Sequence, residues 1–222
     1  MTDESPRVTL TFDNGPDPHV TPRVLDALGE RGLRATFFVV GERLAAPGAR
    51  AMSERARAEG HWIGNHTWSH SRPLGLLQDD DAVRREIEQA QALIGDLAHR
   101  ERWFRPMGGG GNLDERLLNA AALDTLRSGG YSVVLWNALP RDWVDPDGWV
   151  ERALAQCRDG ALLVLHDTST GAMDHLERFL DRAIEIGVRF VQDIPPACVP
   201  IQRGEPVRSL DGLIAPAAGG RR

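Results

Sequence analysis

This sequence contains no lysine: all 26 of its basic residues, in a chain of 222, are arginine. The absence excludes a lysine Schiff base, a lysine general base and the phosphate-binding lysine of a Walker motif. Cysteine is also scarce, because Cys157 and Cys198 are the only two. Two cysteines are too few for a disulfide scaffold, and we interpret them as structural thiols.

Long apolar runs and basic clusters are lacking as well. No apolar run reaches the length of about 18 residues that a transmembrane helix requires, so the sequence predicts no membrane span. The net charge is −6 and no basic cluster contains interleaved aromatic residues, which disfavours binding to nucleic acid. Residues 1–6 are polar and acidic and lack the pattern of a signal peptide. From this we expect a cytoplasmic protein.

Apolar residues make up 41% of the chain, which is enough for the core of one large domain. Short apolar or alternating segments, typical of strands, recur between segments with helical periodicity. We expect strands at residues 7–12, 35–40, 61–64, 102–105, 131–136, 161–165 and 188–192. We expect helices at residues 22–31, 47–59, 79–100, 114–128, 146–158 and 172–186.

The regular alternation of strand and helix predicts a single α/β domain with parallel strands. The length and the seven strand units suit a small barrel, which we place at residues 7–195. Residues 1–6 form an N-terminal lead. Residues 196–222 are rich in proline, glycine, alanine and arginine, and we expect a loosely attached or disordered tail there.

A pair of histidines follows the third expected strand. His66 and His70 are four residues apart, and residues at this spacing share one face of a helical turn. Two neutral imidazoles directed at one point are the beginning of a zinc-type site. The spacing alone is also compatible with capping or surface histidines, so the remainder of the sequence decides its meaning.

Further polar residues fall at the carboxyl ends of the other expected strands. Asp13 and Asn14 follow the first strand, Arg105 ends the fourth, Asp142 follows the fifth, and His166 ends the sixth. Individually these residues have ordinary structural explanations: a turn, a surface ion pair, a helix cap and a core histidine. Active sites of parallel barrels lie at the carboxyl ends of the strands. The joint occurrence therefore favours a catalytic site over five coincidences.

Five segments together resemble the ordered motifs of the polysaccharide deacetylase family, which is carbohydrate esterase family 4 or the NodB homology domain. The resemblance covers residues 7 to 193 or so. It implies an irregular (β/α)7-type barrel and the metal-dependent removal of N-acetyl, sometimes O-acetyl, groups from chitin-like or peptidoglycan glycans. The segments are 11–16 (TFDNGP), 66–70 (HTWSH), 102–109 (RWFRPMGG), 142–143 (DW) and 164–167 (VLHD).

The resemblance implies four catalytic roles. Asp13 corresponds to the general base that activates a water molecule, and Arg105 to the residue that holds and tunes this base. His166 corresponds to the general acid for the leaving amine, oriented by Asp142. These roles meet the demands of amide hydrolysis, which needs a base and an acid with separated pKa values.

The resemblance also implies a divalent metal, with zinc as the first expectation and cobalt, nickel or manganese as alternatives. His66 and His70 correspond to metal ligands. Asn14 stands where the family normally has a second aspartate, the third protein ligand. A neutral amide compensates less of the metal's charge, so we expect weaker metal binding. Three alternatives follow: an active enzyme with a weaker metal, a rearranged site with Asp13 as ligand, or a pseudo-enzyme that binds a glycan without turnover.

For the substrate, the resemblance implies an oxyanion contact from the Gly108 backbone amide and an acetyl slot between Trp143 and Leu165, beside Pro106. Gly108 replaces a tyrosine usual in the family, which removes an aromatic wall. The expected partner is an N-acetylated oligosaccharide or glycan. Tryptophans near the expected strand ends serve either sugar stacking or core packing: Trp68, Trp103, Trp136 and Trp143.

Other classes of protein remain as alternatives. A carbohydrate-binding module would keep the tryptophans but release no acetate. Another metal-dependent C–N hydrolase, a deformylase or cyclic amide hydrolase, would release formate or open a ring. A structural barrel with incidental histidines would fold without metal.

Overall fold

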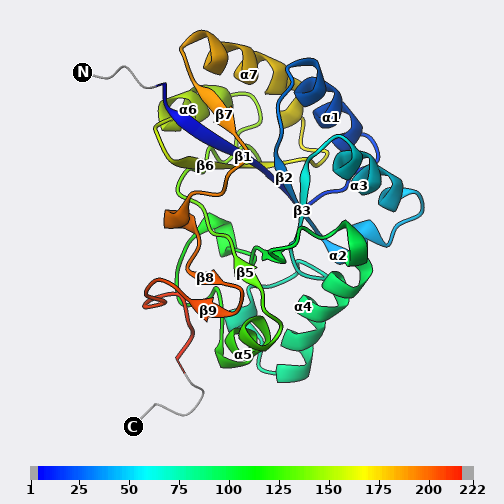
Figure 1. Cartoon of the computed structure of the whole chain (residues 1–222), viewed down its shortest axis with the longest axis vertical. Helices are drawn as coiled ribbons and strands as arrows, with labels where there is room; N and C mark the ends of the chain where they lie inside the picture. The colour runs from blue at the N-terminus through cyan, green and yellow to red at the C-terminus, as the bar shows by residue number, and fades with distance from the viewer. Residues whose placement is uncertain (1–4, 217–222) are drawn as a thin grey trace.

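The centre of the structure is one sheet of mostly parallel strands, around which the helices are arranged (Figure 1). This is a computed structural model, and it describes residues 5–216. The strands follow one another in the sheet as β6-β1-β2-β3-β4-β5, and all neighbours in this series are parallel. Their bounds are β1 Arg7–Asp13, β2 Thr36–Val39, β3 Trp62–Asn65, β4 Trp103–Phe104, β5 Ser132–Val133, β6 Ala161–His166 and β7 Arg189–Val191.

Strand β1 pairs with three other strands and fixes the geometry of the pocket described below. It pairs with β6 along nearly its whole length, from Val8 opposite Ala161 to Asp13 opposite His166. Its other edge pairs with β2 near the carboxyl end and with β7 near the amino end. Because the pairing is in register to the last residue, Asp13 and His166 leave the sheet side by side.

The sheet curves into a half-barrel instead of closing through its seventh strand. Strand β7 pairs with the amino end of β1, on the edge that β2 also uses. A single bridge between Ala138 and Leu163 joins the segment after β5 to β6. The prediction of a single α/β domain with parallel strands is confirmed, and the structure refines the barrel to this partly open form.

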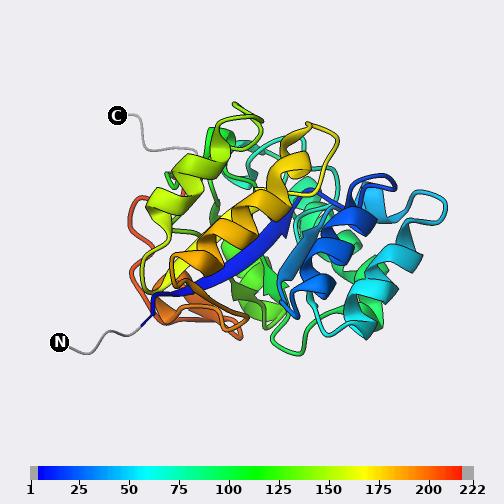
Figure 2. The same ribbon diagram turned by 90° about the horizontal axis from the view of Figure 1, so that it is seen from above.

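Apolar side chains pack on both faces of the sheet, as the alternation of a strand requires. On β6, Leu163 and Leu165 lie in the cluster between the sheet and the outer helices. Leu162 and Val164 lie in the inner cluster. Helices α1 and α7 cover the outer face beside β1 (Figure 2).

The six expected helices are present, whereas the short helix α2 was not expected, and the two largest differences in helix ends occur in α4 and α5. Helix α4 ends at Ile94, well before residue 100, because Gly95 takes a φ of 56° and breaks the helix. Helix α5 begins at Ala120, not at residue 114, because Asn119 caps it by accepting a hydrogen bond from the Ala122 amide. The bounds are α1 Thr21–Glu30, α2 Gly41–Leu44, α3 Ala49–Ala58, α4 Asp80–Ile94, α5 Ala120–Ser128, α6 Trp149–Gln156 and α7 Leu176–Glu185. None of the helices within residues 5–216 is both long and apolar enough to span a bilayer.

The segment after residue 195 is attached to the domain, which corrects the expectation of a loose tail for residues 196–216. Strand β8, Ile201–Gln202, pairs antiparallel with β5 and forms a short hairpin with β9, Glu205–Pro206. Cys198, Val199 and Ile201 are buried in the inner cluster. The prediction from composition was wrong here because a few buried apolar side chains are enough to attach this segment to the domain. Residues 217–222 of the expected tail and residues 1–4 of the N-terminal lead lie outside the described residues.

This attachment predicts the effect of shortening Ile201, whose side chain is fully buried. Ile201→Ala should lower the free energy of unfolding by about 2–5 kcal/mol, the usual cost of such a truncation in a core. Urea unfolding followed by circular dichroism measures it. The matched control is Val207→Ala, whose side chain is 52% exposed and should change stability by no more than about 0.5 kcal/mol. Equal, small effects of both variants would show that the segment contributes nothing to the core.

Candidate active site

A pocket with a volume of about 280 Å³ opens at the carboxyl ends of the strands. Eight residues that the sequence analysis singled out line it together: Asp13, Asn14, His66, His70, Pro106, Gly108, Trp143 and His166. Arg105 and Asp142 lie behind this lining and are fully buried. The remaining lining is apolar or small: Met107, Gly110, Gly111, Trp136, Leu139, Val164, Thr168 and Thr170.

A buried ion pair holds Asp13 at the end of β1. Arg105 Nη1 donates to Asp13 Oδ1 over 2.7 Å and to Thr11 Oγ1 over 2.7 Å. Its Nε donates to the Val134 carbonyl, and its guanidinium carbon lies 4.0 Å from the centre of the Phe38 ring. Burial lowers the pKa of Arg105, and the charge of Asp13 and its hydrogen bond oppose this effect. The pair therefore fixes a carboxylate in one orientation at the pocket.

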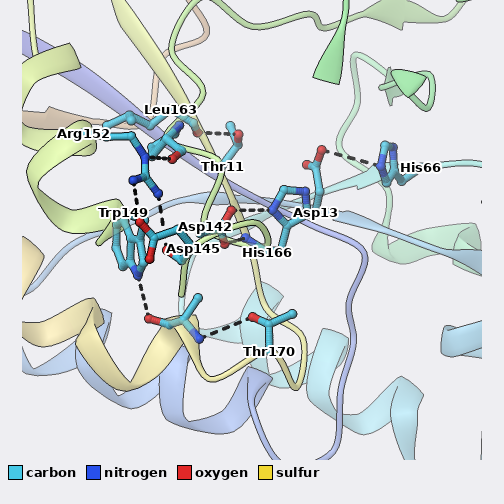
Figure 3. A network of polar contacts seen from close by, with 12 residues as sticks. Thr11, Asp13, His66, Asp142, Asp145, Trp149, Arg152, Leu163, His166 and Thr170 are labelled. Atoms are coloured by element: carbon cyan, nitrogen blue, oxygen red, sulfur yellow. Dashed lines mark hydrogen bonds and ion pairs between the residues drawn. The ribbon is translucent and has the colours of Figure 1, made fainter. Parts of the chain in front are cut away.

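His66 is held as a neutral imidazole with one free nitrogen. Its Nδ1 lies 2.7 Å from the Arg105 carbonyl oxygen, which can only accept, so Nδ1 is the protonated nitrogen. The lone pair of Nε2 is then free and lies 3.6 Å from Asp13 Oδ2 (Figure 3). Burial lowers the pKa of His66 to about 3, so the ring stays uncharged at neutral pH.

His70 joins His66 at the same point of the pocket. The ring centres are 4.6 Å apart. Burial, and secondly the neighbouring His66, lower the pKa of His70 to about 3. The backbone that brings them together has a φ of 68° at Thr67 and 52° at His70, values that non-glycine residues rarely adopt. The spacing therefore does gather two imidazoles, but on a strained loop and not on a helical turn.

Glu86 of α4 stabilises this loop, and the sequence analysis missed it. Its Oε2 accepts from the amides of Trp68 and Ser69 over 3.1 and 3.0 Å, and its Oε1 accepts from Ser69 Oγ. Asn65 contributes from the other side, since its Oδ1 accepts from the Thr67 amide and its Nδ2 donates to the Ile87 carbonyl. A side chain that acts from a distant helix leaves no local signal in the sequence.

Asn14 carries a polar atom that nothing else in the described structure uses. Its Oδ1 is buried and has no hydrogen-bond partner among residues 5–216, and its φ is 73°. Over the same range, no group of three or more histidine, cysteine, aspartate or glutamate side chains is arranged to hold a metal ion. A metal here would rest on two imidazoles and this neutral oxygen. Two free ring nitrogens and an unpaired oxygen fit a divalent cation.

Asp142 and His166 form a second charged pair on the opposite side of the pocket. Asp142 Oδ1 lies 2.8 Å from His166 Nδ1, and Oδ2 accepts from the His166 backbone amide over 2.9 Å (Figure 3). Burial by itself lowers the pKa of His166. The hydrogen bond and charge of Asp142, with smaller contributions from Asp13 and Asp167, outweigh burial and raise this pKa above its ordinary value. The edge of the Trp143 ring packs against the imidazole, with 4.8 Å between ring centres.

Asp167 explains why Gly15 follows Asn14. A side chain at Gly15 would overlap the Asp167 carboxyl group, so only glycine fits. Burial raises the pKa of Asp167 to about 7, and a hydrogen bond from Thr21 Oγ1 to its Oδ2 partly opposes this. The sequence analysis gave Asp167 no role; the structure shows it supporting the turn that carries Asn14.

The expectation for Leu165 is wrong. Its side chain lies in the outer cluster and does not reach the pocket. Val164 lines the pocket instead. The reason is the two-residue period of a strand: His166 faces the pocket, so Val164 shares its face and Leu165 faces the helices.

The Asp142–His166 pair makes a prediction that needs no substrate. Asp142→Asn keeps the shape of the side chain but removes its charge, so the pKa of His166 should fall. NMR titration of the imidazole measures it. Asp147→Asn is the matched control, because Asp147 is exposed and contacts His175 instead. An unchanged pKa of His166 in Asp142→Asn would contradict the electrostatic account.

Comparisons with known proteins identify the family to which the chain is similar. The family model described as polysaccharide deacetylase matches residues 1–133. A peptidoglycan-N-acetylglucosamine deacetylase of Bacillus cereus is 31% identical over 191 residues, which cover 83% of this chain and 84% of that protein. A chitooligosaccharide deacetylase of Rhizobium leguminosarum bv. trifolii is 35% identical over 164 residues, which cover 72% of this chain and 71% of that protein.

Solved structures show the same fold. The peptidoglycan deacetylase PdaC from Bacillus subtilis matches with a TM-score of 0.72 at 28% identity, covering 85% of this chain and 88% of that chain. A family 4 acetyl xylan esterase from Clostridium thermocellum in complex with a cobalt ion matches with a TM-score of 0.69 at 28% identity, covering 84% and 87%. The chain therefore belongs to the polysaccharide deacetylase family of hydrolases, carbohydrate esterase family 4.

Proposed function

We propose that this protein is a metal-dependent deacetylase that removes N-acetyl groups from an amino-sugar oligosaccharide or glycan. The observation that carries the proposal is the in-register pairing of β1 and β6, which puts Asp13 and His166 at one pocket beside His66 and His70. The relatives named as chitooligosaccharide and peptidoglycan deacetylases support N-acetylglucosamine as the sugar.

His66, His70 and the Asn14 amide oxygen are the residues that would hold a divalent cation, for which zinc and cobalt are the first candidates. When bound, such a cation supplies acidification of water, which provides a nucleophile at neutral pH. The neutral state of both imidazoles favours this use, because only the unprotonated nitrogen binds a metal.

Proton transfer belongs to two groups of the chain itself. Asp13, held by Arg105, accepts the proton of the attacking water. His166, whose protonated form the Asp142 carboxylate favours, donates a proton to the leaving nitrogen, so that the products are acetate and a free amine. The backbone amide of Gly108, a residue of the pocket lining, would donate to the developing oxyanion.

The direct test measures acetate release from N-acetylglucosamine oligomers and peptidoglycan fragments, with and without added zinc or cobalt. Acetate should appear with metal and disappear on chelation. Formate is measured from the corresponding N-formyl sugars to test the deformylase alternative. Absence of acetate from every substrate at saturating metal would overturn the proposal.

The division of roles predicts different losses for two histidines. His166→Ala should lower turnover by about 10²–10⁴-fold, the usual contribution of a general acid, and leave metal affinity unchanged. His70→Ala is the contrasting variant and should weaken metal binding. Calorimetric titration with zinc and acetate release measure the two effects. Loss of metal binding in His166→Ala would make His166 a ligand and overturn its assignment as the acid.

From the position of Asn14 we predict that a carboxylate in its place would increase the affinity for the metal. Asn14→Asp adds a negative charge next to the cation, so zinc affinity should rise and activity should increase when metal is scarce. At saturating metal the gain should shrink, because a more neutralised metal acidifies water less.

Calorimetry and acetate release at several zinc concentrations test this expectation. Gln78→Glu is the charge-matched control, since Gln78 is exposed and lies outside the pocket lining. Equal zinc affinity of wild type and Asn14→Asp would show that position 14 does not face the metal.

A further inference from the structure

The glycine run after β4 makes room for three large side chains. A Cβ atom added to Gly108 would lie 2.6 and 2.7 Å from Cη2 and Cζ2 of Trp136, and 3.1 Å from the Asn112 carbonyl oxygen. A Cβ atom added to Gly111 would overlap Leu139 and would lie 3.4 Å from Trp143 Cη2. Side chains of the loop after β5 therefore pack against these glycines. They form the apolar wall of the pocket.

Trp136 is the member of this wall that is fixed most firmly. Its ring is only 9% exposed, and its Nε1 donates to the Gly111 carbonyl over 3.2 Å. The guanidinium carbon of Arg105, which holds Asp13, lies 6.0 Å from the centre of the ring. Trp136 therefore stands deep in the pocket, next to the Asp13–Arg105 pair.

The apolar wall includes Val164, which lies below the candidate catalytic residue His166. Val164 precedes His166 by two residues on the same face of β6, so it lies beneath the imidazole and deeper in the barrel. Val164 and Trp136 belong to the same inner cluster and both line the pocket. Val164 and Trp136 therefore form an apolar surface in the same pocket as Asp13 and His166, where burial of an apolar substituent of the substrate would be favourable.

We propose that Trp136, packed edge-on against Gly108, determines which acyl groups the pocket accepts by closing the space beyond an acetyl methyl group. The inference rests on the proposed deacetylase function and adds a residue that sets specificity. An amino sugar is rich in hydroxyl groups, and its acyl group is its most apolar part, so the apolar floor suits the acyl chain. Because the indole is held on its edge by Gly111, it cannot swing aside for a longer chain.

The test compares wild type with Trp136→Ala on chitooligosaccharides carrying N-acetyl, N-propionyl or N-butyryl groups. In wild type, kcat/KM should fall by about 10-fold or more for each added methylene, as a pocket of fixed depth requires. In Trp136→Ala the fall should disappear or reverse. The matched control is Trp62→Ala, because Trp62 is also partly buried but lies outside the pocket lining; it should keep the wild-type order. The same order of substrates in Trp136→Ala would overturn the proposal.

A double-mutant cycle tests the packing without relying on activity. Gly108→Ala should lower the melting temperature because the new methyl group meets the indole. Trp136→Phe, which shortens the ring system, should remove most of the penalty of Gly108→Ala. Additive melting temperatures would show that Trp136 does not press on position 108 and would overturn the packing on which the proposal stands.

Binding separates failure of this inference from failure of the proposed function. Calorimetric titration with the same N-acetyl, N-propionyl and N-butyryl oligomers measures acyl preference whether or not acetate is released. A wild-type preference for N-acetyl that Trp136→Ala loses supports the role of Trp136 even in a protein that does not turn over. Identical binding of all three oligomers by wild type would overturn it, whatever the activity.

Discussion

The site depends on one buried arginine. Arg105 contacts Asp13 and Thr11 on β1 through its guanidinium group and Val134 after β5 through its Nε. Its own carbonyl oxygen accepts from His66 after β3. A single residue at the end of β4 thus connects the ends of three other strand segments. Removing one partner of a buried pair leaves an uncompensated charge that costs about 3–5 kcal/mol, so both the fold and the site depend on this residue.

The pKa values of the three pocket histidines are shifted in opposite directions. His66 and His70 are desolvated next to each other, which favours the neutral form that binds metals. His166 is also largely shielded from solvent, but the Asp142 carboxylate reverses the effect of burial on its pKa. Identical side chains therefore differ in pKa because, of the three, only His166 has a carboxylate partner among the described residues within hydrogen-bond distance. This separation of charge states is what acid–base hydrolysis at neutral pH needs.

Sequence reasoning located the polar residues of the site because strand ends are easy to recognise and parallel strands end on one side. Asp13, His66, His70 and His166 all reach the pocket that their positions predict. Sequence reasoning failed for residues whose side-chain orientation or distant partner had to be known. Leu165 was placed in the pocket although the alternation from His166 points it outwards, and Trp136 was left between stacking and packing. The support of the histidine loop by Glu86 depends on tertiary structure, which no local pattern records.

The pairing of β8 with β5 has a consequence for how the domain is made. Strand β5 follows β4 directly in the sheet, but its second edge is covered by Ile201 and its neighbours Cys198 and Gly204, far later in the chain. Until the segment from Cys198 onwards has been synthesised, this edge of β5 lacks the partner that covers it in the finished structure. An uncovered strand edge is a template for pairing with another molecule. The short hairpin of β8 and β9 thus covers a strand edge that would otherwise be open to pairing with another molecule.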